Sequence, residues 1–271
     1  MNAFLKSKKK PSLKIIHVLR LEVKHLEAFV GLLTIQKNAG ARSEIPDRLE
    51  KLYHEAGRVR KFELEMRAIQ SITNNKKLSK PNLFLKHLIF SKKKSSKKLR
   101  KKRKEYPSFK LRDFVKHPGV RLSSHTWQQF LAARASSILD LLTEDIISDI
   151  RSLHQLRKIL KSILYVLPLC KNGVKPLRVF LKTHKKFIKS VQSKIGSLHD
   201  INSFVTSLEK KYNIIHASEE RALIKVKQKW QDDMKRTRES LQALLPPMRQ
   251  FALDLKNHST DKLKSARVVF I

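Results

Sequence analysis

The sequence of 271 residues contains little that breaks helices or crosslinks chains: six glycines, nine prolines and a single cysteine. Without frequent glycine and proline, helix-favouring residues such as Leu, Lys, Ile, Glu and Ala fill long uninterrupted stretches. The lone Cys170 excludes an internal disulfide framework and is typical of a reducing compartment, where we expect a small buried side chain. The sequence therefore predicts an all-α fold.

Long apolar runs are also missing. No segment approaches the length that a membrane-spanning helix requires, and residues 1–14 are basic without the apolar stretch and cleavage site of a signal peptide. We therefore expect a cytoplasmic protein with no membrane partner. Hydrophobic residues still make up 41% of the chain, which is enough to form a core and argues against a disordered basic tail.

Acidic residues are scarce: 23 Asp and Glu face 60 Lys and Arg, for a formal net charge of +37 at pH 7. Such an excess repels itself unless anions offset it, so a polyanion partner is the first expectation. A basic surface that merely keeps the chain soluble is the alternative. The densest basic run, Lys92–Lys104, is more typical of a solvated, partly mobile segment than of a shaped site, and we interpret it as auxiliary charge.

Apolar residues recur at helical spacing along most of the chain. The predicted helical segments are Leu13–Leu33, Ile45–Ile69, Ser124–Leu142, Leu153–Cys170, Pro176–Ile195, Ala217–Leu245 and Pro247–Asn257. Gly57 lies inside the second segment and Gly196 interrupts the fifth. Because a glycine in a helix costs about 1 kcal/mol relative to alanine, each marks either a break or a close helix crossing.

One pattern occurs twice. The apolar positions from Leu19 to Leu33 follow steps of four, three, four and three, and the same steps recur 137 residues later, from Leu156 to Cys170. Gly57 and Gly196 are separated by a similar 139 residues. We infer an internal duplication: one helical bundle over residues 1–271 with two pseudo-symmetric halves, about 10–120 and about 121–260, around a pseudo-two-fold axis.

A basic motif, His-x-x-Arg-x-x-x-Lys, repeats on the matching helices. Its members are His17, Arg20 and Lys24 in the first half and His154, Arg157 and Lys161 in the second. At about 100° per residue these positions share one helix face, so each half presents a column of three donors. Arg offers a planar fork for oxygen atoms, Lys a mobile charge and His a donor that responds to pH. One column alone would be an ordinary solvated face, but its recurrence indicates a shared anion groove.

These motifs resemble those of the conserved histidine α-helical domain family, known as CHAD. The matching pieces are His17-Val-Leu-Arg20 with Lys24, Ala56-Gly57-Arg-Val-Arg60, His154-Gln-Leu-Arg157-Lys158 with Lys161 and Tyr165, and Gln192-Ser-Lys-Ile-Gly196-Ser-Leu-His199-Asp200. They span about residues 10 to 260. The chain departs from the family at Glu27, Ser162 and Leu164, where further arginines are common, and at Lys61, where an acidic residue is.

The resemblance implies a helical bundle with internal two-fold symmetry that binds inorganic polyphosphate in a basic groove where its halves meet, without catalysis. The binding residues that it implies are His17, Arg20, Lys24, Arg60, His154, Arg157, Lys158 and Lys161. Such a protein is expected in the cytoplasm or at polyphosphate granules.

Nucleic acid is the leading alternative ligand, because an RNA or DNA backbone would satisfy the same groove. Polyphosphate has no bases and needs no stacking platform. Aromatic residues amount to only 7%, and Phe29, Phe62, Phe180 and Phe187 fall on apolar stripes where a core position is expected. No RNP, KH or zinc-knuckle pattern occurs.

An enzyme is the third class. Glu63 and Glu65 precede Arg67 in an alternation that resembles triphosphate-processing tunnel enzymes, but on a helix the two carboxylates point about 200° apart, and we interpret them as a solvated helix face. His199 and Asp200 are adjacent and would diverge on a helix. No Walker loop, nucleophile elbow or zinc-ligand spacing occurs, so we expect no catalytic residue, metal or cofactor.

Overall fold

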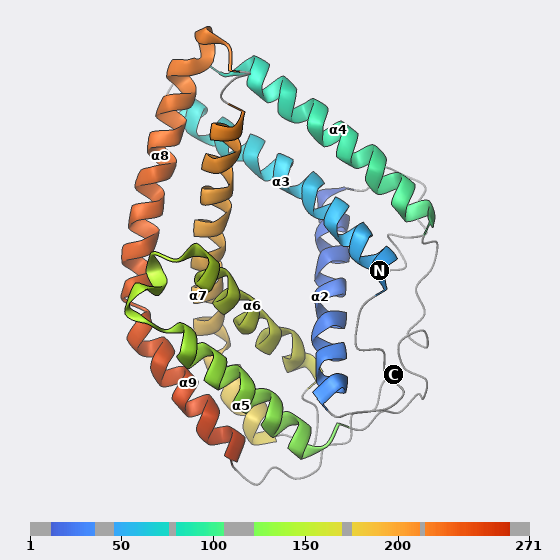
Figure 1. Ribbon diagram of the computed structural model, residues 1–271, viewed down its shortest axis with the longest axis vertical. Coiled ribbons are helices and arrows are strands. Elements are labelled where there is room, and N and C mark those ends of the chain that lie inside the picture. Colours follow the sequence, from blue (N-terminus) through green and yellow to red (C-terminus); the bar gives the residue numbers. More distant parts are fainter. Residues whose placement is uncertain are drawn as a thin grey trace. The chain divides into compact units, whose positions relative to one another are not determined.

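The computed structural model describes residues 12–35, 46–75, 80–105, 122–169, 175–211 and 215–260. These ranges are helical and contain no strand, so the all-α prediction is confirmed (Figure 1). The elements are α2 (Leu13–Ile35), α3 (Asp47–Asn75), α4 (Asn82–Glu105), α5 (Ser124–Leu141), the 3-10 helix η2 (Glu144–Ile147), α6 (Ile150–Val166), the 3-10 helix η3 (Leu167–Leu169), α7 (Lys175–Lys210), α8 (Ala217–Gln242) and α9 (Leu245–Thr260). Cys170 lies outside the described residues. None of the described helices has the length and apolarity needed to cross a membrane.

The chain divides into two compact units. Unit 1 consists of Met1–Val23, Pro46–Phe109 and Asp200–Arg236, and unit 2 of Lys24–Ile45, Lys110–His199 and Thr237–Ile271. The boundaries fall within α2, α7 and α8, and each unit combines segments from both halves predicted from the sequence. The internal duplication therefore stays a prediction.

The core of unit 1 is formed where α3 and α4 pack side by side against parts of α7 and α8 (Figure 1). Its buried members are Met66, Ile69, Phe84, Leu85, Leu88, Phe204, Leu208, Leu223, Val226 and Trp230. Glu219 of α8 fixes the start of α4, because its two carboxylate oxygens accept hydrogen bonds from the amides of Leu83 at 2.6 Å and Phe84 at 3.0 Å. A carboxylate in this place satisfies donors that the first helical turn leaves unpaired and complements the helix dipole.

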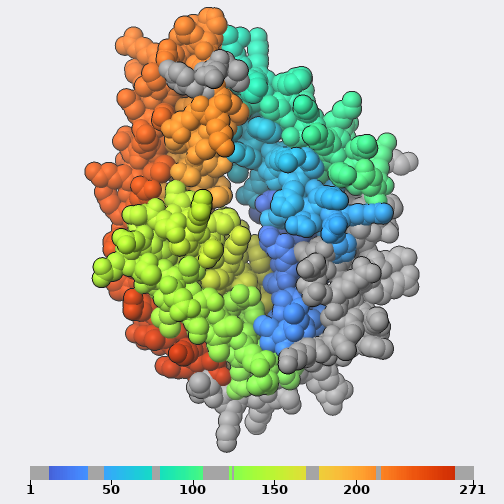
Figure 2. All heavy atoms as spheres, viewed as in Figure 1, coloured from blue at the N-terminus to red at the C-terminus, as the bar shows by residue number. Residues whose placement is uncertain are grey.

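The basic run Lys92–Lys104 forms the second half of α4, a regular helix with one side buried, and is not solvated all round as expected. Ser95, Ser96 and Leu99 are buried and continue the three-to-four-residue spacing of the apolar residues that precede them. Lys92 is tied to Glu63 of α3 by a 2.5 Å hydrogen bond. The helix is therefore specified by small and apolar residues within the run, and its lysines are exposed or half-buried. Atoms of α4 are visible on the face of the molecule drawn in Figure 2.

Glu63 and Glu65 have different partners, as their helical register predicts, but Glu65 does not lie on a solvated face. Its side chain is fully buried and forms an ion pair with Lys211, whose Nζ lies 3.6 Å from Oε1. Burial lowers the pKa of Lys211, against the opposing effect of Glu65. Removing one partner would leave an uncompensated buried charge, which typically costs about 3–5 kcal/mol. The interior side of α3 thus holds a structural ion pair.

In unit 2, α5 packs against α9 and α6. Arg249 of α9 donates a 3.0 Å hydrogen bond to the carbonyl of Leu142, immediately after the last residue of α5. Asp149 caps the start of α6 by accepting a 2.8 Å hydrogen bond from the amide of Arg151. The inner face of α6 buries Leu153, Leu156, Leu160, Ile163 and Val166. The remaining face of α6 carries the basic motif.

Candidate functional site

Two arginines pack against helical glycines, Arg20 against Gly57 of α3 and Arg157 against Gly196 of α7. Neither Gly57 nor Gly196 interrupts its helix, so the break considered from the sequence does not occur, and the close approach is made by a side chain. A Cβ atom at Gly57 would lie 2.5 Å from Nη1 of Arg20, and one at Gly196 would lie 2.9 Å from Nη2 of Arg157. Both distances are shorter than an ordinary contact, so only glycine leaves room for these guanidinium groups.

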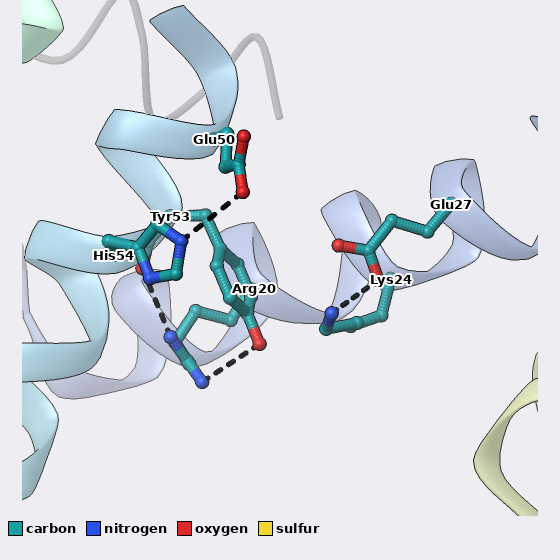
Figure 3. Close-up of polar contacts among 6 residues, drawn as sticks. All are labelled: Arg20, Lys24, Glu27, Glu50, Tyr53 and His54. Atoms are coloured by element: carbon teal, nitrogen blue, oxygen red, sulfur yellow. Dashed lines mark hydrogen bonds and ion pairs between the residues drawn. The ribbon is translucent and has the colours of Figure 1, made fainter. Parts of the chain in front are cut away.

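In unit 1 the guanidinium of Arg20 is held by Tyr53 of α3. Nη1 donates to the Tyr53 carbonyl and Nη2 to the Tyr53 hydroxyl, each at 3.0 Å, and the guanidinium carbon lies 4.1 Å from the ring centroid (Figure 3). Tyr53 precedes Gly57 by four residues, so its carbonyl is the one that faces the glycine along the helix. The missing Cβ therefore exposes a backbone acceptor, and the arginine uses it.

His17 and Arg60 complete the cluster in unit 1. Nη1 of Arg60 lies 2.9 Å from Nδ1 of the exposed His17. A guanidinium can only donate, so this hydrogen bond requires Nδ1 of His17 to be unprotonated. Three of the predicted binding residues, His17, Arg20 and Arg60, are thus brought together, and with Tyr53 and Gly57 they form what we call the unit-1 cluster.

The same arrangement occurs in unit 2. Nε of Arg157 donates to the carbonyl of Gln192, at 3.4 Å, and Gln192 precedes Gly196 by four residues. The ring of His154 packs on that of His199, with centroids 4.6 Å apart and planes inclined by 31°. His199 follows Gly196 by three residues, as Arg60 follows Gly57. In both units the arginine meets the glycine and the carbonyl four residues earlier, and the histidine meets the residue three positions later.

The environment of His154 is positively charged. Burial, followed by His199, Lys158, Arg157 and Lys161, lowers the pKa of His154 from 6.5 to about 4, so the imidazole is uncharged at neutral pH. Its Nδ1 is buried and hydrogen-bonds to no residue that the structure describes. We call the group formed by His154, Arg157, Lys158, Lys161, His199 and Gly196 the unit-2 cluster. It repels further positive charge and would be stabilised by an anion.

Lys24 of α2 has an acidic partner on its own helix. It forms a hydrogen-bonded ion pair with Glu27 one turn along α2 (Figure 3). The unit boundary follows Val23, so this turn of α2 belongs to unit 2, where the neighbouring His25 makes an edge contact with Tyr165 of α6 at 5.0 Å. The departure at Glu27 noted in the sequence thus partly neutralises Lys24.

Sequence reasoning missed Tyr53, the role of the Gln192 carbonyl and the pairing of His199 with His154. The signal that identifies them is their position relative to a helical glycine: four residues before it for the carbonyl, and three after it for the partner of the histidine. The single groove expected between two halves stays a prediction. What the structure describes is one cluster in each unit.

The described residues contain no group of three His, Cys, Asp or Glu side chains that could hold a metal ion. No protein-family model, curated protein or solved structure matches this chain. The resemblance to the CHAD family therefore rests on the sequence motifs.

Proposed function

We propose that this protein binds inorganic polyphosphate, without catalysing its turnover, through the unit-1 and unit-2 clusters. The observation that carries the proposal is the unit-2 cluster, where the charges of Arg157, Lys158 and Lys161 act on a half-buried imidazole that is paired with a second one. A fold that holds like charges together is stabilised when an anion lies among them.

The arrangement favours a polymer of phosphates over a single small anion. Each motif column covers seven residues of helix, about 10 Å, which is long enough for several successive phosphate groups. The arginines are held against backbone carbonyls, so their planar forks are oriented before the ligand arrives. The aromatic ring within the unit-1 cluster, Tyr53, is covered by Arg20 and is not free to stack on a base. These features support recognition of phosphate charge.

Matched charge removal tests the proposal. In one variant, Arg20, Lys24, Arg157 and Lys161 are replaced by Ala. In the control, four exposed residues on other helices are replaced by Ala: Arg178, Lys182, Arg221 and Lys225. The control also loses two arginines and two lysines, so both variants lose the same charge. With labelled long-chain polyphosphate near physiological salt, the first variant should lose at least about tenfold in affinity and the control far less. Equal losses would show that the ligand responds to total charge alone.

Competition tests the choice of polymer. Unlabelled long-chain polyphosphate should displace the labelled polymer from the clusters. Pyrophosphate, single-stranded RNA and duplex DNA should displace it poorly. Nucleic acid is the alternative ligand, because its backbone carries the same phosphate charges. Nucleic acid could compete as well as polyphosphate, and its binding could be lost in the first variant. The clusters would then bind polyanions in general and not polyphosphate in particular.

A further inference from the structure

The outer face of α4 carries a second concentration of positive charge, and it shares no residue with either cluster. Its exposed basic residues are Lys86, Lys93, Lys94, Lys97, Lys98, Arg100, Lys101 and Lys104. By contrast, Lys92 and Lys102 are paired with Glu63 and Glu105. Within the described part of the chain, no carboxylate lies within 4.0 Å of the eight exposed cations.

These cations form an ordered strip along the helix. Lys93, Lys97, Lys101 and Lys104 follow steps of four, four and three residues, so they line one face over about 17 Å. Like charges at this spacing oppose helix formation, and the buried inner side of α4 is what holds them in place. The strip is therefore a fixed row of cations whose mutual repulsion a row of phosphates would relieve.

Phe90 lies at one end of this strip and is 67% exposed, the largest exposure among the large hydrophobic residues that the structure describes. Lys86 precedes it by four residues, and Lys93 and Lys94 follow it by three and four, so lysines surround the ring on the helix surface. Polyphosphate offers such a ring no apolar surface. A nucleobase does, because every base has a face that stacks on an aromatic side chain.

The structure also favours a single strand over the other anionic partners of a basic helix. A helix that binds a membrane surface inserts a continuous apolar face, but the apolar face of α4 formed by Phe84, Leu85 and Leu88 is buried in the core of unit 1. The large apolar residues that α4 exposes, Leu83, Ile89 and Phe90, lie only in its first half, and the lysine strip extends beyond them. In a duplex the bases are stacked on one another and their faces are not available to Phe90. Unstacked bases on a flexible backbone match both the exposed ring and the row of lysines.

We infer that the outer face of α4 binds single-stranded nucleic acid without sequence preference, with backbone phosphates on its lysines and a base stacked on Phe90. The surface acts independently of polyphosphate binding by the two clusters, so either property can fail without the other.

The test measures binding of a labelled oligouridylate to the full-length protein. Phe90→Ala should weaken binding by about tenfold, because one stacked base is lost, whereas Phe90→Trp should retain it. The matched control is Val179→Ala on α7, which removes an apolar side chain that is 64% exposed beside basic residues but cannot stack. Polyphosphate affinity should be unchanged by Phe90→Ala.

A second variant tests the cations. Replacing Lys93, Lys97 and Lys101 with Gln should reduce the slope of log affinity against log salt by about two, since each phosphate contact to a single strand contributes about 0.7. The inference is overturned if Phe90→Ala leaves oligouridylate binding unchanged, or if a duplex of the same length binds as tightly and with the same dependence on Phe90. It is also overturned if these variants lose binding to anionic lipid vesicles and keep binding to the oligonucleotide.

Discussion

The unit-1 and unit-2 clusters share their geometry but differ in how far the protein itself occupies their donors. In unit 1, Arg20 donates twice to Tyr53, and Arg60 donates to His17. In unit 2, Arg157 makes one long hydrogen bond to Gln192, and the histidine pairs with another histidine. Two motifs with the same cations can therefore differ in how strongly they bind an anion. We expect the unit-2 cluster to provide most of the affinity for polyphosphate.

The largest expected difference is between the two arginines. A hydrogen bond to a charged group contributes about 1.5–3 kcal/mol, so Arg157→Ala should weaken polyphosphate binding by roughly tenfold to a hundredfold. Arg20→Ala should weaken it less, because Tyr53 already uses two of its donors. Stability should change in the opposite order, with Arg20→Ala costing about 1–2 kcal/mol for its lost hydrogen bonds and ring contact. Polyphosphate titration and urea unfolding of both variants measure the two quantities.

Equal losses of affinity in these variants would remove the distinction between the clusters. A large loss of stability in Arg157→Ala with unchanged affinity would show that Arg157 is only a packing residue. The matched control Arg178→Ala, an exposed arginine on α7, should change neither quantity appreciably.

The glycines sharpen the comparison. A Cβ at Gly196 would lie within 3.2 Å of three guanidinium atoms of Arg157, whereas one at Gly57 would approach only a single atom of Arg20 that closely. Gly196→Ala should therefore displace the whole group and weaken binding by roughly threefold to tenfold, and Gly57→Ala should weaken it less. Gly196→Ala should not lose stability, because alanine favours a helix by about 0.5–1 kcal/mol over glycine and Arg157 gives up only one long hydrogen bond. In Gly57→Ala the same gain is offset by the lost contacts of Arg20 with Tyr53, so this variant should be less stable than Gly196→Ala by about 1 kcal/mol.

Gly31 in α2 provides the control for that experiment, since a Cβ there would meet nothing within 4 Å. Gly31→Ala should gain stability and keep its affinity. If it loses affinity as Gly196→Ala does, the effect belongs to helix propensity and not to the displaced arginine.

Much of the fold follows from apolar periodicity. The predicted segment Leu13–Leu33 ends within two residues of the end of α2. Both basic motifs lie on α-helices, as predicted, one on α2 and one on α6. The sequence predicts an interruption at Gly196, however, whereas α7 continues through it to Lys210. The local cost of a glycine is about 1 kcal/mol, which packing along a long helix readily outweighs.

The contacts inside the candidate sites could not be read from local sequence. His154 and His199 are far apart in the chain, and their pairing depends on how α6 meets α7. The burial of Glu65 was missed for the same reason, because its partner Lys211 lies beyond the end of α7. In α4, charge obscured the regular burial of Ser95 and Leu99. Periodicity predicts which face of a helix is inside, but not what it meets there.

The lowered pKa of His154 makes the unit-2 cluster sensitive to pH. Because the folded-state pKa of His154 is lowered from 6.5 to about 4, the unfolded chain takes up a proton first as the pH falls. The free protein therefore loses stability between pH 6.5 and about 4. Polyphosphate affinity should rise over the same window by a few-fold, because a bound anion favours the charged imidazolium.

Binding and urea unfolding at pH 7 and pH 5 test this linkage. His154→Gln should remove both pH effects, whereas the exposed His125→Gln should leave them in place. If His17→Gln removes them and His154→Gln does not, the pH-sensitive group lies in the unit-1 cluster and the comparison is reversed.

The smallest expected effect concerns Lys24, which is tied to Glu27, whereas the position that corresponds to Glu27 on α6 is Leu164. A partly exposed ion pair contributes at most about 1 kcal/mol, so Glu27→Gln should raise polyphosphate affinity by about twofold to threefold as Lys24 becomes available. Glu22→Gln makes the same charge change at an exposed site on the same helix and should raise it less. Equal gains would mean that net charge acts alone. No gain from Glu27→Gln would mean that Lys24 does not reach the polymer, leaving the α2 column with His17 and Arg20.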